Sequence, residues 1–203
     1  MYMDKVSYAL GMSIGQNLLN SGVVDLNFDD FKNGIKVIYT NETPEITPEE
    51  GNKVLEEFFA EAKKIAEERE KKERQENLKK ADEYLKENAS RDLTRVTKTG
   101  LQYKVITEGN GQSPSAHSRV RVHYEGRLTD GTVFDSSYKR GEPTEFGLGQ
   151  VIPGWTEGLQ LMKEGSTYEF TLPPQLGYGE VGVPGHIPGN SVLIFKVELI
   201  KVL

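Results

Sequence analysis

One stretch of about 40 residues constrains this chain most, because it holds almost nothing that ends a helix. After Pro48 there is no proline as far as Asn88, and the only glycine is Gly51. Thr47 directly precedes Pro48, and Glu50 follows three residues after Thr47, which is the pattern of a helix N-cap with a capping box. At 1.5 Å per residue, such a helix extends over about 60 Å. The sequence therefore predicts a long rod.

The middle of this predicted helix, residues 67–77, is polar on every face, whereas its apolar side chains lie at the two ends. A helix that is polar all round either bridges solvent or is held by side-chain pairs. Several acid–base pairs have the favoured i, i+4 order: Glu67–Lys71, Glu68–Lys72, Glu70–Arg74 and Glu76–Lys80. We interpret the segment as a stalk that separates two modules. The alternative is the solvated face of an ordinary helix.

Glycine and proline divide the chain into two compositional halves. Residues 97–203 contain 16 of the 21 glycines and 7 of the 9 prolines, and both residues favour turns. The first half therefore reads as helices and the second as short strands and loops. The prediction is an α+β protein with two domains, an all-helical domain with its stalk at residues 1–92 and a sheet domain at residues 93–203.

The helical half has too few apolar positions for a core of its own. Val6, Leu10, Ile14 and Leu18 recur four apart on one helical face, and residues 25–39 form a second helix. Because two copies can bury each other's apolar stripes, we predict a homodimer through residues 1 to about 65. Two glycines of the first helix share another face and either admit a partner helix closely or merely tolerate crowding: Gly11 and Gly15.

The second half shows the period-2 alternation of half-buried strands at residues 101–105, 119–124, 167–172 and 193–199. Asp130-Gly131 lies between apolar segments and indicates a hairpin. The only helical candidate there is residues 155–162, which follow Pro153-Gly154. This pattern predicts an antiparallel sheet wrapped around one short helix.

Several kinds of chemistry are excluded or disfavoured by the residues present. The chain has no cysteine, and its three histidines lack metal-ligand spacing, so no metal site is expected. A net charge of −6 argues against a nucleic-acid partner. Residues 147–149 lack the lysine of a phosphate-binding loop, and no base partner is evident for Ser136 or Ser137. No cofactor is implied.

The N-terminal residues lack the basic start and long apolar run of a signal peptide, and no stretch reaches the roughly 18 apolar residues that span a bilayer. We therefore expect a soluble cytoplasmic protein without a membrane partner. A periplasmic location is expected only if an export signal has been removed.

What remains is a set of aromatic side chains beside a few polar ones. Taken singly, each ring is more often part of a core. Asp135 and Arg140, however, follow an apolar run closely, and the only tryptophan, Trp155, stands at a tight helix entry after Pro153-Gly154. A pocket with an indole floor, aromatic walls and one or two polar groups is the usual anatomy of a small-ligand site.

From about Leu101 to its end the chain resembles the FKBP-type peptidyl-prolyl cis-trans isomerases. The residues that carry this resemblance are Val122–Gly126, Asp130–Ser137, Val151–Trp155, Tyr178-Gly179 and Leu193–Leu199. The first half, with Tyr8–Gly11 and the long charged helix, resembles the dimerising N-terminal domain of bacterial Mip-like and FkpA-like members. Thr144, Gln150, Val183 and His186 depart from many eukaryotic members, which bears on macrolide affinity and substrate preference.

The resemblance implies which side chains form the site. The implied catalytic residues are Asp135, Tyr178, Phe134 and Trp155. The implied substrate-binding residues are Tyr124, Arg140, Phe146, Val151, Ile152, Ile187 and Phe195. The implied partners are proline-containing peptides and unfolded or partly folded proteins, with a macrolide as a further ligand.

An isomerase of this kind has to lower the barrier of about 18–20 kcal/mol that amide resonance creates. An apolar pocket disfavours the charge-separated planar form of the prolyl amide more than the twisted form. We therefore predict catalysis by desolvation and positioning, without proton transfer. The runner-up hypothesis is a non-catalytic holdase chaperone that captures clients between its helices, and a purely structural dimeric adaptor is the third.

Overall fold

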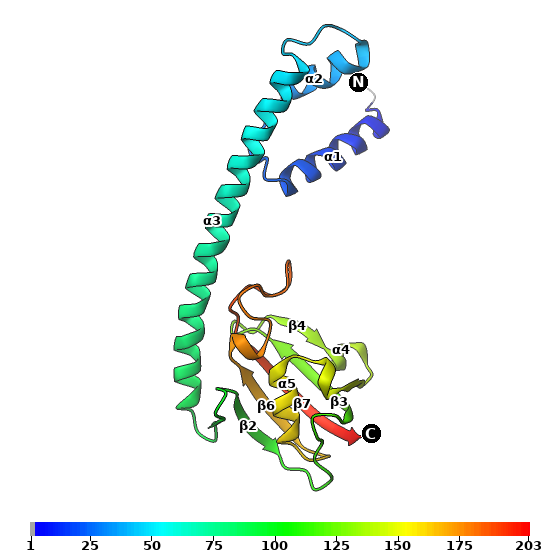
Figure 1. The fold of residues 1–203 in the computed structure, drawn as a ribbon. Helices are drawn as coiled ribbons and strands as arrows, with labels where there is room; N and C mark the ends of the chain where they lie inside the picture. The colour runs from blue at the N-terminus through cyan, green and yellow to red at the C-terminus, as the bar shows by residue number, and fades with distance from the viewer. Residues whose placement is uncertain (1–2) are drawn as a thin grey trace. The chain divides into compact units, whose positions relative to one another are not determined.

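A computed structural model describes residues 3–203, and the chain divides into two compact units, Met1–Glu68 and Arg69–Leu203. The first unit is helical, and the second contains an antiparallel sheet with a short helix against it (Figure 1). The predicted α+β class is confirmed. Because the division falls inside helix α3 (Pro48–Ala89), one helix contributes to both units. The domain boundary at residues 92 and 93 stays a prediction.

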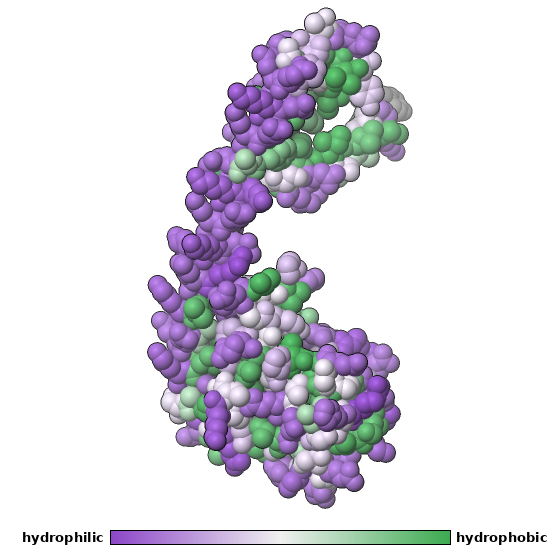
Figure 2. Space-filling view, in the orientation of Figure 1, coloured by the Kyte–Doolittle hydropathy of each residue, from purple (hydrophilic) through white to green (hydrophobic). Residues whose placement is uncertain are grey.

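The helical unit begins with α1 (Lys5–Asn20) and α2 (Phe28–Thr40). Asn27 caps the second helix, since its side chain accepts hydrogen bonds from the backbone N–H groups of Asp29 and Asp30. No side chain between residues 3 and 68 is buried, and Phe28 and Ile38 are 78% and 74% exposed. Figure 2 shows apolar surface along these helices. Within the described chain, this unit therefore lacks a core of its own.

Nothing within residues 3–203 approaches the two glycines of α1. A Cβ built at Gly11 or Gly15 meets no atom within 4 Å. Neither glycine is therefore needed for a contact inside the chain, and their interpretation as a site of close helix approach stays a prediction.

Helix α3 begins as the sequence predicts. The Glu50 backbone N–H donates to Thr47 Oγ1 at 3.2 Å, and the Thr47 N–H donates to Glu50 Oε2 at 2.8 Å, which completes the capping box. Of the predicted acid–base pairs, the described residues form Glu70–Arg74, at 2.7 Å. The remaining predicted partners stay apart because exposed side chains at this spacing gain little from pairing.

The C-terminal part of α3 packs on the sheet instead of crossing solvent. Its buried and half-buried residues recur at helical spacing: Arg74, Asn77, Ala81, Tyr84, Leu85 and Asn88. The Asn88 side chain donates to Gln102 Oε1 at 2.8 Å, and Gln102 Nε2 donates to the Leu85 carbonyl at 2.8 Å. Arg74 and Asn77, which the sequence places in the all-polar part of the stalk, are therefore half-buried within the second unit.

The sheet follows the order β1-β2-β6-β7-β3-β4, with β5 paired to β3, and every pair is antiparallel. Its strands are β1 (Arg95–Val96), β2 (Gln102–Thr107), β3 (Arg119–Arg127), β4 (Val133–Ser136), β5 (Thr144–Gly147), β6 (Thr167–Leu172) and β7 (Leu193–Val202). The predicted alternation is clear in β3, where Val120, Val122 and Tyr124 are buried and their neighbours are not. The hairpin at Asp130-Gly131 is present, since the Gly131 N–H donates to the Leu128 carbonyl.

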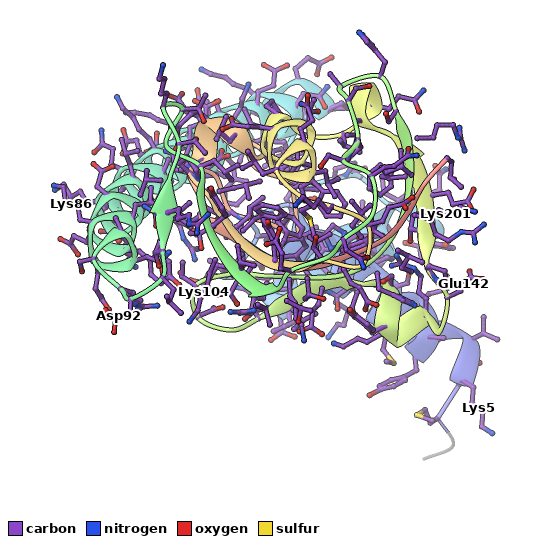
Figure 3. All side chains as sticks on the ribbon, turned by 90° about the horizontal axis from the view of Figure 1, so that it is seen from below. Lys5, Lys86, Asp92, Lys104, Glu142 and Lys201 are labelled. Atoms are coloured by element: carbon purple, nitrogen blue, oxygen red, sulfur yellow. The ribbon has the colours of Figure 1, made fainter. Side chains whose placement is uncertain are left out.

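Four short helical segments connect the strands, namely α4 (Ser137–Arg140), η1 (Leu148–Gln150), α5 (Pro153–Gln160) and η2 (Pro174–Leu176). The sequence predicts α5 and misses the other three. Helix α5 lies close against the sheet because a Cβ at Gly158 would be only 2.8 Å from the Phe170 ring. Leu159 is fully buried in the core beneath it, whereas Lys104 and Lys201 point outward (Figure 3).

The helices between residues 3 and 203 include none with the length and apolar character needed to cross a bilayer.

Candidate active site

The second unit contains an open cavity of about 360 Å³, which we call the aromatic cup. Its walls come from β3, β4, β5, η1, the start of α5, the loop after η2, and β7. The lining residues are Tyr124, Phe134, Asp135, Thr144, Phe146, Gln150, Val151, Ile152, Trp155, Tyr178 and Phe195. The cup therefore joins segments that lie far apart in the sequence.

The Trp155 indole is the centre of the ring arrangement. Tyr124 and Phe195 meet it edge to face, with centroids 5.0 and 5.2 Å away, and Phe146 is tilted against it at 5.2 Å. Phe134 in turn packs edge to face on Phe195 at 5.6 Å. These are the separations at which aromatic pairs attract each other. The indole also lines the cavity, so it forms part of the surface that a bound molecule would contact.

Local geometry at the start of α5 places the indole there. Pro153 occupies the first turn, where a missing N–H costs nothing, and the Trp155 N–H donates to the Ile152 carbonyl at 2.9 Å. The Thr156 hydroxyl donates to the Leu148 carbonyl at 2.6 Å and so holds α5 against η1. Gly154 lets the helix approach the sheet, since a Cβ there would be 2.4 Å from Leu172 Cδ2.

Asp135 is the one acidic side chain that lines the cup, and two donors hold it. Its carboxylate accepts hydrogen bonds from the Tyr124 hydroxyl and from the Arg140 guanidinium. Arg140 also donates to the Tyr124 oxygen at 3.0 Å and to Thr144 Oγ1 at 3.2 Å. Burial alone would raise the pKa of Asp135, but the bonds from Tyr124 and Arg140 outweigh it and lower that pKa. Asp135 is therefore ionised at neutral pH.

The two tyrosine hydroxyls of the cup remain protonated donors. Burial raises the pKa of Tyr124, and the hydrogen bond to Asp135 adds to the rise. Burial also raises the pKa of Tyr178, and the negative charge of Asp135 acts in the same direction. Tyr178 is 40% exposed, so its hydroxyl is available at the rim to a bound molecule.

The structure brings together most of the residues that the sequence analysis singles out. Arg140 does not line the cup but reaches it through Asp135 and Tyr124. Ile187 does not line it either: its side chain is 6% exposed and belongs to the hydrophobic core. Thr144 and Gln150 line the cup, although the sequence analysis names them only as departures from the family pattern. Their signal is their place in the sequence, since Thr144 lies two residues before Phe146 on β5 and Gln150 directly precedes Val151.

The structure supplies a base partner that the sequence did not reveal. His123 Nδ1 lies 2.9 Å from Ser137 Oγ, and the His123 ring stacks on Tyr138 with centroids 4.7 Å apart. His123 is half-buried, because Tyr138 covers one face of its ring. Ser137 is fully buried, and its oxygen accepts the Tyr124 backbone N–H at 2.8 Å. This hydroxyl cannot reach a substrate and instead ties α4 to β3.

Comparison with known proteins gives two family matches. A family model described as FKBP-type peptidyl-prolyl cis-trans isomerase matches residues 110–200. A second, described as the domain amino terminal to FKBP-type peptidyl-prolyl isomerase, matches residues 3–105. Together they extend over almost the whole chain.

Similar proteins match the chain over most of their length. The chain is 41% identical over 199 residues to the FKBP-type 22 kDa peptidyl-prolyl cis-trans isomerase of Escherichia coli (strain K12), covering 98% of this chain and 95% of that protein. It is 44% identical over 201 residues to the outer membrane protein MIP of Legionella longbeachae, covering 98% and 85%. The crystal structure of FkpA from Escherichia coli matches with a TM-score of 0.78 at 39% identity, over 98% of this chain and 95% of that chain.

Proposed function

We propose that the aromatic cup is the catalytic site of this chain, which belongs to the FKBP-type peptidyl-prolyl cis-trans isomerases. Its reaction is rotation about the peptide bond that precedes proline. One observation carries the assignment of the site: the only tryptophan lines an open cavity walled by aromatic rings, with one ionised carboxylate at the side. A prolyl ring and its amide fit such a surface without any bond being broken.

Desolvation is the first contribution that the cup makes. Amide resonance places negative charge on oxygen and positive charge on nitrogen, and water stabilises this planar form. The rings of Phe134, Phe146, Trp155 and Phe195 replace that water with apolar surface. The planar ground state then loses more stabilisation than the twisted state, so the barrier falls.

Positioned polar groups are the second contribution. The Tyr178 hydroxyl is a donor at the rim, suited to the carbonyl oxygen of a bound prolyl amide. Asp135 stays ionised and fixed by Tyr124 and Arg140, so it acts through its electric field and does not exchange a proton. A hydrogen bond that fits only the twisted amide lowers the barrier further.

The test is isomerisation of a proline-containing tetrapeptide by the full chain and by two cup variants, Trp155→Leu and Tyr178→Phe. We expect both to lower kcat/KM, the first by more because it removes the floor. Tyr138→Phe is the matched control, because Tyr138 lies outside the cup and bonds to Glu198. Full activity in Trp155→Leu would rule out the cup as the catalytic site.

A second proposed activity is the binding of unfolded proteins by a homodimer. The observation that favours it is the helical unit, in which every apolar side chain within residues 3–68 is exposed or only half-buried. A second copy would bury part of this surface, and two cups on one dimer raise the effective concentration of a client. Sedimentation of the full chain as a monomer of 22.7 kDa would remove the dimer proposal.

Two further proposals concern ligand and location. A macrolide is a proposed ligand of the cup, and the fluorescence of the only tryptophan would report its binding. The expected cytoplasmic location finds no support among the relatives, one of which carries the name outer membrane protein. We therefore propose the periplasmic alternative, which cell fractionation tests directly.

A further inference from the structure

Residues 177–191, between η2 and β7, form a segment that we call the flap loop. Holding this loop in one conformation costs conformational entropy. Four of its residues have positive φ, namely Gly179, Gly182, Gly185 and Asn190. Glycine has the widest conformational freedom in the unfolded chain, so ordering such a segment costs more entropy than ordering an ordinary loop. The flap loop carries Tyr178 of the cup near its first residue. Its order therefore bears directly on the site.

Hydrogen bonds inside the flap loop join its two ends. The Asn190 N–H donates to the Gly179 carbonyl at 2.9 Å, and the Gly179 N–H donates to the Pro174 carbonyl at 2.9 Å. Further along, Val183 and Ile187 exchange two backbone hydrogen bonds of 2.8 Å. The conformation at Tyr178 thus depends on where Asn190 is held.

Helix α3 holds that position from outside the loop. The Asn77 side-chain amide donates to the Gly189 carbonyl at 3.1 Å, and the Asn190 amide donates to the Arg74 carbonyl at 3.0 Å. Helix α3 thus donates one hydrogen bond to the flap loop and accepts another from it. This part of α3 lies in the same compact unit as the sheet.

The contact is close as well as hydrogen-bonded. A Cβ at Gly189 would lie 2.0 Å from the Glu180 carbonyl oxygen and 3.2 Å from Arg74 Cγ. Only a glycine leaves room for the Glu180 carbonyl oxygen here, and the Arg74 side chain of the helix is close as well. Asn190 has a φ of 58°, a conformation that asparagine tolerates better than most residues, and it is only 7% exposed. Both flap residues are therefore adapted to this contact.

We propose that Asn77 and Asn190 are positioning residues for the isomerase, which fix the flap loop on α3 and thereby hold Tyr178 at the rim of the cup. The order of contacts runs from α3 through Asn190 to Gly179, whose neighbour in the chain is Tyr178. This inference rests on the proposed role of the cup. It extends the catalytic machinery to a helix that contributes no side chain to the cup.

The proposal predicts a particular kinetic signature. If the loop is released, only a fraction of molecules presents Tyr178 correctly, and the apparent affinity falls by that fraction. Once substrate has bound, the site is assembled and turnover is little changed. Loss of one hydrogen bond corresponds to about a fivefold change in an equilibrium constant. We expect Asn77→Ala in the full chain to raise KM for a prolyl tetrapeptide by up to about fivefold, the limit reached where the released loop predominates, and to alter kcat by less than about twofold.

The matched control lies on the same face of the same helix. Asn88→Ala removes hydrogen bonds to Gln102 and Thr171, so it also weakens the contact of α3 with the sheet. It does not touch the flap loop. We expect a comparable loss of thermal stability but an unchanged KM. Asn190→Gly is the second variant, because glycine accepts the positive φ while losing the amide, and it should reproduce the KM of Asn77→Ala.

Amide hydrogen exchange supplies a readout besides activity. We expect faster exchange at residues 179–190 in Asn77→Ala and unchanged exchange there in Asn88→Ala. Equal KM values in Asn77→Ala and the parent chain, or equal rises in Asn77→Ala and Asn88→Ala, would overturn the positioning role while leaving the cup assignment intact. Full activity in Trp155→Leu would instead show that the cup is wrongly assigned and would overturn both.

Discussion

Gly126 offers a sharp test of the cup because a methyl group there would push on two of its walls. It lies on the buried face of β3, two residues beyond Tyr124. A Cβ at Gly126 would be 2.6 Å from Phe195 Cε1 and 2.7 Å from Phe134 Cε2 and Cζ. Carbon atoms in ordinary contact are about 3.5–4.0 Å apart, so each ring has to withdraw by about 1 Å. Neither moves freely, since Phe195 also packs on Trp155 at 5.2 Å.

The added methyl group of Gly126→Ala has two effects: it overpacks the core, which lowers stability, and it displaces the rings of the cup, which lowers the rate. Inserting a methyl group into a filled core costs about 1–3 kcal/mol of the free energy of unfolding. For a unit of this size, that lowers Tm by roughly 2–12 °C, at about 2–4 °C per kcal/mol. Most molecules stay folded at 25 °C, yet a shift of about 1 Å at the reacting groups can lower the rate about 100-fold. We therefore expect Gly126→Ala to lower kcat/KM by about tenfold to 100-fold.

The measurement pairs thermal unfolding with tetrapeptide isomerisation at 25 °C, where the folded fraction is checked by circular dichroism. Gly149→Ala is the control, because a Cβ there meets no atom within 4 Å and the residue has no positive φ. Gly149→Ala should change neither Tm nor kcat/KM appreciably. The reasoning would be refuted by a folded Gly126→Ala chain with the parent kcat/KM, since the rings would then have moved without consequence for catalysis.

Three further predictions concern charge, assembly and packing. Because the pKa of Asp135 is lowered, its charge and the stability it contributes persist above the unfolded value of about 3.9 and are lost only as pH falls through the lower folded value. We therefore expect kcat/KM to stay constant from about pH 5 to pH 8. A titration midpoint of kcat/KM inside that range, present in the parent chain and absent in Asp135→Asn, would contradict this. Leu10→Glu should yield monomers in sedimentation while Gln16→Glu, on a face of the same helix away from the apolar stripe, stays dimeric, and dimers in both would refute the proposed interface. Leu159→Ala should lower the free energy of unfolding in urea by about 2–5 kcal/mol, since Leu159 is fully buried, and a loss below about 1 kcal/mol would contradict that packing.

The sequence predicts those elements whose formation depends mainly on residues close by in the chain. The start of α3 follows from Thr47 and Glu50, whose reciprocal bonds depend only on local spacing. Strands β4 and β5 went unpredicted because each has four residues and pairs with the long strand β3, so its order comes from its neighbour. The cup was predicted mainly through family motifs. Periodicity alone does not distinguish a ring that lines a cavity from one that fills a core.

The docking of α3 shows why the remaining part escaped prediction. Apolar residues at helical spacing predict a hydrophobic face, and this face of α3 has a few of them near its end. Asn77 and Asn88, however, also bind the sheet domain and are as polar as the solvated residues beside them. An amide is informative only when its partner is known, and the partners Gly189 and Gln102 lie in distant segments. Such a contact stabilises little by burial, and it is lost when geometry changes slightly. That combination suits a contact that has to set the position of a loop rather than hold a fold together.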